Sequence, residues 1–363
     1  MRFQKVGIIG AGTMGSGIAT TLAQKGVSVL LVDSSVAAAN AGKEKAIKFY
    51  QGAVKKGKMS EEDAAKSADN IGVAGDLKSL ILCDLVIEAI FEEYSVKAKL
   101  LRELDGIVAS TTVVATNTSA LTVSGLADNI STPSRFLGLH YFNPAAVNPI
   151  VEVVRGAQTS DVVYQKALDF IEQTGKTPLA CKDSYGFAIN RFFVPYGNEA
   201  MRLIDEGIGT MPQIDRVAKQ TLHAPAGPFQ VMNLVKPKIM YNAQKNLNPH
   251  GDFYSLASGL ADIANNDHEF DLTGSDSGSE EQDKIIADRL MMACFIPVLQ
   301  AIDEAVAVPQ AFDLGAKLAL KFGVGPVELM NELGQDKVQK LVEMATAKYG
   351  IDPVKSLAKV GSL

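Results

Sequence analysis

The chain of 363 residues is predicted to contain an α/β domain with a parallel sheet, residues 1–184, followed by two tandem all-α helical domains, residues 185–284 and 285–363. Three observations support this prediction. Short apolar strands alternate with helices in the first half, and the first strand runs into a glycine-rich turn. From about residues 182–186 onward the hydrophobic periodicity is helical. The helical half also contains an internal repeat.

Composition and charge argue against several classes of protein. Hydrophobic residues make up 47% and charged residues 21% of the chain, as in soluble globular proteins, and the net charge of −6 argues against nucleic acid as the main partner. No apolar run approaches the length needed to span a bilayer, so no membrane partner is expected. The three cysteines are scattered without metal-ligand spacing, and the first strand begins at Lys5, which leaves no room for a targeting segment. We therefore expect a reducing, cytoplasmic location and no metal site.

The first strand–turn–helix–strand unit carries a motif typical of dinucleotide binding. Residues 6–9 form an apolar strand that enters Gly10-x-Gly12-x-x-Gly15, and a second strand ends in Asp33. Gly10 allows a tight turn, Gly12 lets backbone amides approach a pyrophosphate, and Gly15 lets the helix pack closely on the strand. The Asp33 carboxylate can accept hydrogen bonds from an adenosine ribose and would repel a 2′-phosphate, so NAD is favoured over NADP. This unit predicts a Rossmann-type fold whose candidate NAD ligands are Gly10, Gly12, Thr13, Met14, Gly15 and Asp33.

Polar residues follow the later strands of the predicted sheet. Residues 84–89 form a buried strand that precedes Glu92, and residues 113–116 form another that is followed by Asn117 and Ser119. In an open parallel sheet, the residues just past the carboxyl ends of the strands line the ligand crevice. Capping of the next helix is the alternative role for Ser119. The residues expected to line one cleft are Glu92, Asn117, Ser119, His140 and Asn143.

Residues 136–154 contain a candidate acid–base pair. This stretch is predicted to form two strands joined by two Asn-Pro turns, with His140 on the first strand and Glu152 on the second. A carboxylate in an apolar strand is costly unless it has a partner. An imidazole, which titrates near neutral pH, makes a general base with its orienting group when it lies beside a buried carboxylate. The alternative is a core histidine bonded to a backbone carbonyl.

Two further polar features are each open to two interpretations. Lys56 lies in a cluster of lysines at residues 55–58, which could hold a phosphate of a long substrate or be a solvated helix end. Asn190 opens a long apolar helix. Its amide would be a ligand if it faced the cleft and a structural group if it faced the core.

The helical half is one module used twice. Residues 191–233 align with residues 289–331 without a gap, with identities at roughly a dozen of about forty positions. The position equivalent to Asn190 is Asp288, so the second copy lacks that amide and is expected to be structural. Between the copies, residues 265–284 are acidic and rich in Gly and Ser, which predicts a surface loop.

Six motifs resemble those of the L-3-hydroxyacyl-CoA dehydrogenase family. In chain order they are GAGTMGSGIA, DLVIEA, NTS, LHYFNP, IVEVV and DSYGFAINR, and the intervals between them fit as well. The resemblance implies NAD-dependent, reversible oxidation of (S)-3-hydroxyacyl-CoA to 3-oxoacyl-CoA, with an acyl-CoA thioester as the substrate. It implies that His140 is the catalytic base with Glu152 as its partner. It also implies that Ser119 and Asn190 contact the reacting oxygen. The positions that bind NAD or substrate in the family are, in this sequence, Glu92, Lys97, Ser119 and Asn143, with Lys56 near a contact to CoA.

The chain departs from the family pattern at Tyr185, where Pro is usual before Gly-Phe, and at Asn233, where Asp is usual. The duplicated module resembles the arrangement in fused β-oxidation proteins of fatty acid metabolism, although no hydratase domain is present. Because this module forms the dimer interface in single-module members, we expect the second copy to pack on the first as an internal pseudo-dimer. A further homodimer is left open, as are the length and branching of the acyl chain.

Two alternative functions are left open by the sequence. The first is an NAD-dependent dehydrogenase of a free hydroxy acid or sugar acid on the same fold. The second is a catalytically inactive NAD-binding structural or sensor protein, against which the complete set of catalytic residues argues. A dehydrogenase that relies on a catalytic lysine is disfavoured because Asn190, and not a lysine, opens the long helix.

Overall fold

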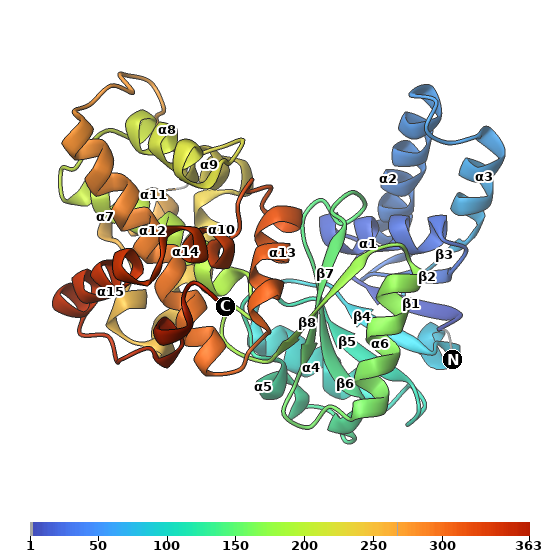
Figure 1. Cartoon of the computed structure of the whole chain (residues 1–363). Coiled ribbons are helices and arrows are strands. Elements are labelled where there is room, and N and C mark those ends of the chain that lie inside the picture. The colour runs from blue at the N-terminus through green and yellow to red at the C-terminus, as the bar shows by residue number, and fades with distance from the viewer. Residues whose placement is uncertain (1–2, 267) are drawn as a thin grey trace. The chain divides into compact units, whose positions relative to one another are not determined.

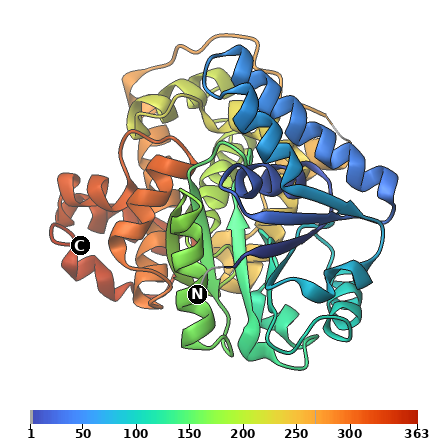
Figure 2. The same cartoon turned by 90° about the vertical axis from the view of Figure 1, so that its right-hand side faces the viewer.

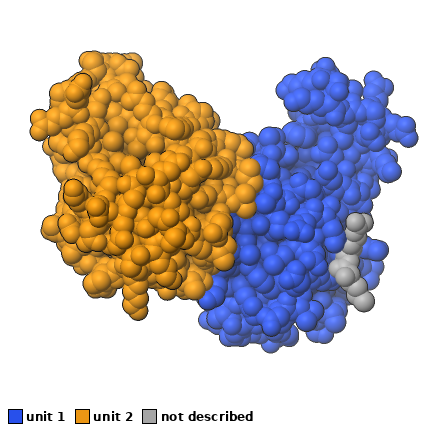
Figure 3. All heavy atoms as spheres, viewed as in Figure 1, with its two compact units in different colours: residues 1–183 blue, residues 184–363 orange. Residues whose placement is uncertain are grey.

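The computed structural model describes residues 3–266 and 268–363, and it divides into two compact units, Met1–Asp183 and Ser184–Leu363 (Figure 3). Both predicted helical domains fall in the second unit. Asp267, within the predicted acidic loop, lies outside the described residues.

The first unit is built on one eight-stranded sheet with the strand order β3-β2-β1-β4-β5-β6-β7-β8 (Figure 1). The strands are β1 (Lys5–Ile9), β2 (Ser28–Val32), β3 (Ile71–Ala74), β4 (Leu85–Glu88), β5 (Val113–Thr116), β6 (Phe136–Tyr141), β7 (Ile150–Arg155) and β8 (Thr177–Lys182). The connecting helices and short 3-10 helices are α1 (Thr13–Gln24), α2 (Val36–Lys55), α3 (Glu61–Asp69), η1 (Leu77–Leu82), α4 (Tyr94–Asp105), α5 (Val123–Ala127), η2 (Pro133–Arg135) and α6 (Asp161–Gln173). Helices α1 and α2 pack on β2, and α6 packs on β7 and β8. The blue hairpin of α2 and α3 projects from the sheet (Figures 1 and 2).

The predicted Rossmann-type α/β class is confirmed, although one pair of strands in the sheet is antiparallel. The sheet is parallel from β3 to β6, whereas β6 and β7 are antiparallel and β8 follows the direction of β7. Only residues 142–149 join β6 to β7. A parallel return would need a crossover of about a dozen residues or more, so this short connection requires an antiparallel pair.

The second unit contains two copies of one helical module. The first copy consists of α7 (Asn190–Asp205), α8 (Met211–Leu222), α9 (Pro228–Val235), α10 (Pro237–Leu247), η3 (Asn248–His250), η4 (Asp252–Tyr254) and α11 (Ser258–Asn265). The second consists of α12 (Glu280–Asp303), α13 (Pro309–Ala319), α14 (Pro326–Leu333), α15 (Gln335–Tyr349) and η5 (Lys355–Lys359). Helices α8, α9 and α10 begin 98 positions before α13, α14 and α15, and α7 and α12 end 98 positions apart. The repeat therefore continues through α10, and α12 packs along α7 (Figure 1).

An aspartate in each copy joins two helices in the same way. Asp215 on α8 accepts a hydrogen bond from the backbone N–H of Phe229 (2.8 Å) at the start of α9. Asp313 on α13 accepts one from the N–H of Val327 (2.8 Å) at the start of α14. A carboxylate at a helix N-terminus satisfies unpaired N–H groups and interacts favourably with the helix dipole. Equivalent residues thus make the same contact in both copies.

Two ion pairs connect the copies reciprocally. Arg191 of the first copy binds Glu304 of the second (Nη2–Oε1, 2.7 Å), and Arg289 of the second binds Glu206 of the first (Nη1–Oε2, 2.8 Å). The two arginines are 98 positions apart, and so are the two glutamates. Reciprocal pairing of this kind is typical of an isologous, twofold interface. The second copy therefore packs on the first in the manner of a dimer partner.

The expectation that no apolar run is long enough to span a bilayer is wrong for α12. Its 24 residues contain an 18-residue window with a mean hydropathy of 1.7. However, 72% of that window is buried inside the unit, where α7, α8, α14 and α15 pack around the helix. A helix buried in a protein core is apolar on most of its faces, as a spanning helix is. Its composition is therefore only weak evidence for a membrane segment.

Gly207 and Ala305 occupy equivalent positions after α7 and α12, and both have a left-handed backbone, with φ of 73° and 53°. A Cβ on Gly207 would meet no described atom within 4 Å. Gly207→Ala should therefore cost only backbone strain, about 1 kcal/mol of the free energy of unfolding. We expect Ala305→Gly to change the free energy in the opposite direction, because it removes the same strain from an exposed residue. Denaturant unfolding of the helical unit, followed by circular dichroism, checks both variants, and shifts of the same sign would contradict this interpretation.

Candidate active site

His140 and Glu152 are direct partners across β6 and β7. The Nδ1 atom of His140 lies 2.7 Å from Oε2 of Glu152; the Glu152 side chain is fully buried and that of His140 is 7% exposed. A carboxylate accepts hydrogen bonds, so this contact suits a His140 tautomer that carries its proton on Nδ1, with Nε2 as the other ring nitrogen. The two residues predicted to pair are thus in contact.

The direction of β7 explains this contact. In an antiparallel pair, side chains directly opposite each other lie on the same face of the sheet and close together. β7 starts from the edge at which β6 ends, so a residue near the start of β7 meets one near the end of β6. Phe142, which follows β6, places its ring centroid 4.5 Å from that of His140 and adds an apolar wall to the imidazole.

Glu92 holds the loop that carries Ser119. Its Oε1 accepts hydrogen bonds from the backbone N–H groups of Ser119 (2.8 Å) and Ala120 (2.9 Å) and from the hydroxyl of Thr118. Burial raises the pKa of Glu92, but the Lys97 ammonium and these hydrogen bonds lower it by more, so the pKa lies below its ordinary value. Glu92 is therefore ionised and anchors the loop after β5.

Lys97 is a buried cation with two carboxylate partners. Its side chain is 1% exposed, and Nζ lies 2.5 Å from Oε1 of Glu88 and 3.3 Å from Oε2 of Glu92. Glu88, at the end of β4, is fully buried and also accepts the hydroxyl of Thr116 at the end of β5 (2.7 Å). This cluster ties two strand ends to the loop that carries Ser119. Sequence reasoning missed Glu88, although a carboxylate in an apolar strand is the same signal that points to the partner of His140.

The glycine-rich turn leaves space where a dinucleotide would lie. Gly10 has a φ of 100°, and a Cβ on Gly15 would lie 1.7 Å from the Gly10 carbonyl oxygen, so both positions require glycine. A Cβ on Gly12 would meet no described atom within 4 Å and would project into the space beside the start of α1. Among the described residues, no side chain caps this helix, which leaves its positive end to an anion. The turn therefore fits the pyrophosphate of NAD, with Thr13 and Met14 in the first turn of α1.

Asp33, directly after β2, is bonded to the same turn. Its Oδ2 accepts the N–H of Ala11 (2.7 Å), and its Oδ1 accepts the N–H (2.7 Å) and the hydroxyl (3.0 Å) of Ser34. Burial raises the pKa of Asp33, but these hydrogen bonds outweigh burial, so the pKa lies below its ordinary value. A charged Asp33 is thus placed where an acid that binds ribose is expected, and it also supports the turn.

The other predicted residues lie in different surroundings. Asn117, after β5, accepts the N–H of Tyr141 at its Oδ1 (2.9 Å) and so ties β5 to β6. Asn143 is exposed in the connection between β6 and β7, and Lys56 is exposed at the end of α2. Asn190 is the first residue of α7 and belongs to the second unit. Their contacts with NAD or substrate stay predictions.

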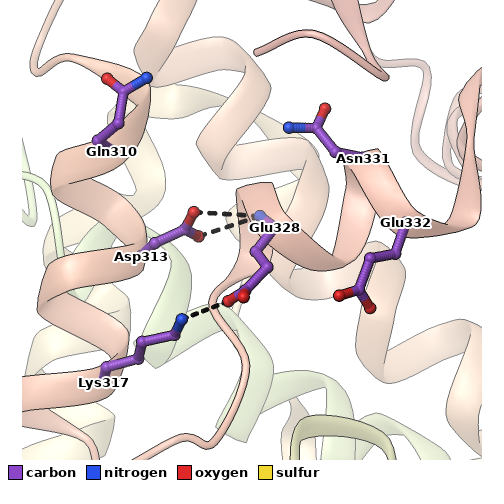
Figure 4. A pocket seen from close by; sticks show the side chains of 6 residues that line it. All are labelled: Gln310, Asp313, Lys317, Glu328, Asn331 and Glu332. Carbon is purple, nitrogen blue, oxygen red and sulfur yellow. Dashed lines mark hydrogen bonds and ion pairs between the residues drawn. The ribbon is translucent and has the colours of Figure 1, made fainter.

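A hollow on α13 and α14 lies in the second copy, and none of the predicted site residues lines it (Figure 4). Its lining residues are Gln310, Asp313, Lys317, Glu328, Asn331 and Glu332. Several of these bind one another, since Asp313 accepts the N–H of Glu328 (3.1 Å) and Lys317 forms an ion pair with the Glu328 carboxylate. We interpret this hollow as a junction between two helices and not as a catalytic site.

Two family models match the chain. The model described as "3-hydroxyacyl-CoA dehydrogenase, NAD binding domain" covers residues 5–184, and the one described as "3-hydroxyacyl-CoA dehydrogenase, C-terminal domain" covers residues 186–264. A probable 3-hydroxyacyl-CoA dehydrogenase of Caenorhabditis elegans is 38% identical over 241 residues, which are 64% of this chain and 78% of that protein.

Two solved structures are also similar. The (S)-3-hydroxybutyryl-CoA dehydrogenase from Ralstonia eutropha is 34% identical, with a TM-score of 0.71 over 73% of this chain and 94% of that one. A 3-hydroxybutyryl-CoA dehydrogenase from Escherichia coli is 22% identical, with a TM-score of 0.88 over 99% of this chain and 98% of that one. The second likeness concerns the fold alone, and it extends over both helical copies.

Lys97→Met removes the charge partner of the buried Glu88 carboxylate. We expect it to lower the free energy of unfolding of the first unit by about 3–5 kcal/mol, because an uncompensated charge is left inside the protein. The double variant Lys97→Met/Glu88→Gln should recover part of this loss. Denaturant unfolding of the four proteins of this cycle checks the prediction, and strictly additive losses would contradict it.

Proposed function

Because this chain belongs to the 3-hydroxyacyl-CoA dehydrogenase family, we propose that it oxidises (S)-3-hydroxyacyl-CoA thioesters with His140 as general base and Glu152 as its partner. The observation that carries this proposal is the 2.7 Å contact between two side chains that are both buried. A histidine with its tautomer held by a buried carboxylate is suited to transfer a proton in either direction.

The mechanism that we propose begins with the hydroxyl proton of the substrate. In oxidation, Nε2 of His140 takes this proton as the carbon–oxygen bond becomes a carbonyl. Glu152 keeps the other ring proton on Nδ1, and its negative charge stabilises the imidazolium that forms. In reduction the same ring returns the proton to the oxygen. NAD, when bound, accepts or donates the hydride at the carbinol carbon.

Ser119 and Asn190 are proposed to donate hydrogen bonds to the reacting oxygen. Donors held at that position stabilise the negative charge that grows on the oxygen during reduction. The contact between Glu92 and the N–H of Ser119 supports this role, because it orders the loop before the substrate binds.

The glycine-rich turn and Asp33 would hold the two ends of the adenosine diphosphate part of NAD. The side chains proposed to complete the NAD and substrate contacts are Glu92, Lys97, Asn117 and Asn143. We assign the exposed Lys56 to a phosphate of coenzyme A, where a flexible cation in water suffices.

His140→Ala and Glu152→Gln should each lower kcat by roughly 10²-fold or more, because they remove the base or its orienting charge. Binding of NADH, followed by its fluorescence, should persist, since neither residue belongs to the glycine-rich turn. His268→Ala, at an exposed histidine of the second unit, is the matched control and should leave kcat unchanged. Near-normal turnover in His140→Ala would overturn the role assigned to the ring.

The substrate class is tested by comparing NAD reduction with (S)-3-hydroxyacyl-CoA thioesters of several chain lengths and with the matching free hydroxy acids. We expect kcat/KM to fall by roughly 10²-fold or more without the thioester, because the binding energy of the coenzyme A part is then lost. Equal or higher kcat/KM with a free acid would favour the alternative function, a hydroxy-acid or sugar-acid dehydrogenase.

A further inference from the structure

Arg191, the residue after Asn190, is buried at the start of α7 and bonded on all sides of its guanidinium. Only 1% of its side chain is exposed. Its Nε donates to the hydroxyl of Tyr254 (3.1 Å), and its Nη1 donates to the hydroxyl of Ser184 (3.0 Å). Both Nη atoms also donate to the carboxylate of Glu304, at 3.0 Å and 2.7 Å.

Glu304 supplies the negative charge in this set, whereas Tyr254 and Ser184 donate or accept as neutral hydroxyls. Burial lowers the pKa of Arg191, but Tyr254 and Glu304 raise it by more. A bidentate pair of guanidinium and carboxylate fixes the orientation of the guanidinium plane. Glu304 is the C-cap residue directly after α12, so the anchor of this arginine comes from the second copy of the module.

The backbone before α7 is held tightly against the same arginine. Gly186 has a φ of 79°, and a Cβ there would lie 2.9 Å from the backbone nitrogen of Arg191. Phe187 also has a left-handed backbone, with a φ of 50°. Because Gly186 and Phe187 are both left-handed, the segment that leads into α7 has few other conformations that would keep α7 in the same place. A shift of the Arg191 side chain would therefore be passed to the first turn of α7.

We infer that the second copy of the module is part of the catalytic apparatus, in which Glu304 acts through Arg191 as a positioning residue for Asn190. This inference rests on the proposed role of Asn190 at the reacting oxygen. Without the Glu304 charge, the buried guanidinium loses its counterion and must move towards water or another acceptor. The first turn of α7 then moves with it, and the Asn190 amide leaves its productive position.

The chain contains its own control for this inference. The reciprocal pair, Arg289 with Glu206, joins the same two copies at the equivalent place, and Arg289 also binds Glu199 of the first copy. The residue before Arg289 is Asp288, which binds Lys337 (Nζ–Oδ1, 2.5 Å). The second copy thus keeps the interface pair but has no amide that it could position. Loss of either glutamate weakens the contact between the copies, whereas only loss of Glu304 disturbs Asn190.

The test compares Glu304→Gln with Glu206→Gln in the full-length enzyme. We expect kcat with a 3-hydroxyacyl-CoA to fall by about tenfold or more in Glu304→Gln and by less than about twofold in Glu206→Gln, because small displacements of a catalytic group are costly. The KM for NAD and the affinity for NADH should stay unchanged in both. Glu304→Asp, which keeps the charge, should recover part of kcat. Should Glu304→Gln not fold, Glu304→Asp is compared with Glu206→Asp, and a smaller loss of kcat that is still confined to the Glu304 variant is expected.

Asn190→Ala, measured in parallel, separates this inference from the proposed function. A large loss of kcat in Asn190→Ala, with equal kcat in Glu304→Gln and Glu206→Gln, would overturn the inference and leave the role of Asn190 standing. Normal kcat in Asn190→Ala would remove the role of Asn190, and the inference with it. A selective loss of kcat in Glu304→Gln, together with a loss in Asn190→Ala, would support both.

Discussion

The antiparallel pairing of β6 and β7 is the constraint on which the candidate site depends. The register of this pair decides which side chains meet, and it places His140 opposite Glu152. A slip of one residue would turn one member of the pair to the other face of the sheet. The parallel strands then contribute what surrounds the pair, because their carboxyl ends carry the residues that hold the glycine-rich turn and the loop of Ser119.

Each unit contains a buried cation that is held by a carboxylate. Lys97 is buried with Glu88 in the first unit, and Arg191 is held by Glu304 in the second. In both pairs the cation is buried, although the Glu304 side chain is 46% exposed. Such pairs add little net stability compared with apolar residues, but breaking one is costly. The main effect of these pairs is therefore to fix the positions of side chains and backbone. Each pair lies beside a residue with a proposed part in the chemistry, and each restricts the backbone that carries it.

Much of the fold and part of the site could be predicted from the sequence, because they follow from local patterns. The glycine-rich turn occupies a few consecutive residues, and the helical repeat appears as matches at a constant interval. The direction of β7 is different, since an apolar strand has the same pattern in either direction. Glu92 accepts the N–H of Ser119, and Arg191 binds Glu304. In each case the two residues are far apart in the sequence, and no repeating pattern of residues links them. Contacts of this kind between distant segments are visible only in the three-dimensional structure.

The two copies of the helical module belong to one polypeptide, which has a consequence for dilute solutions. Separate subunits come apart as their concentration falls, whereas copies joined by a chain keep a high effective concentration for each other. The contact of α7 with α12 is thus independent of how much enzyme is present. A tethered pair can also diverge, because a substitution occurs in one half only. The second copy has Asp288 at the position where the first copy has Asn190. Identical subunits encoded by one gene cannot differ in this way.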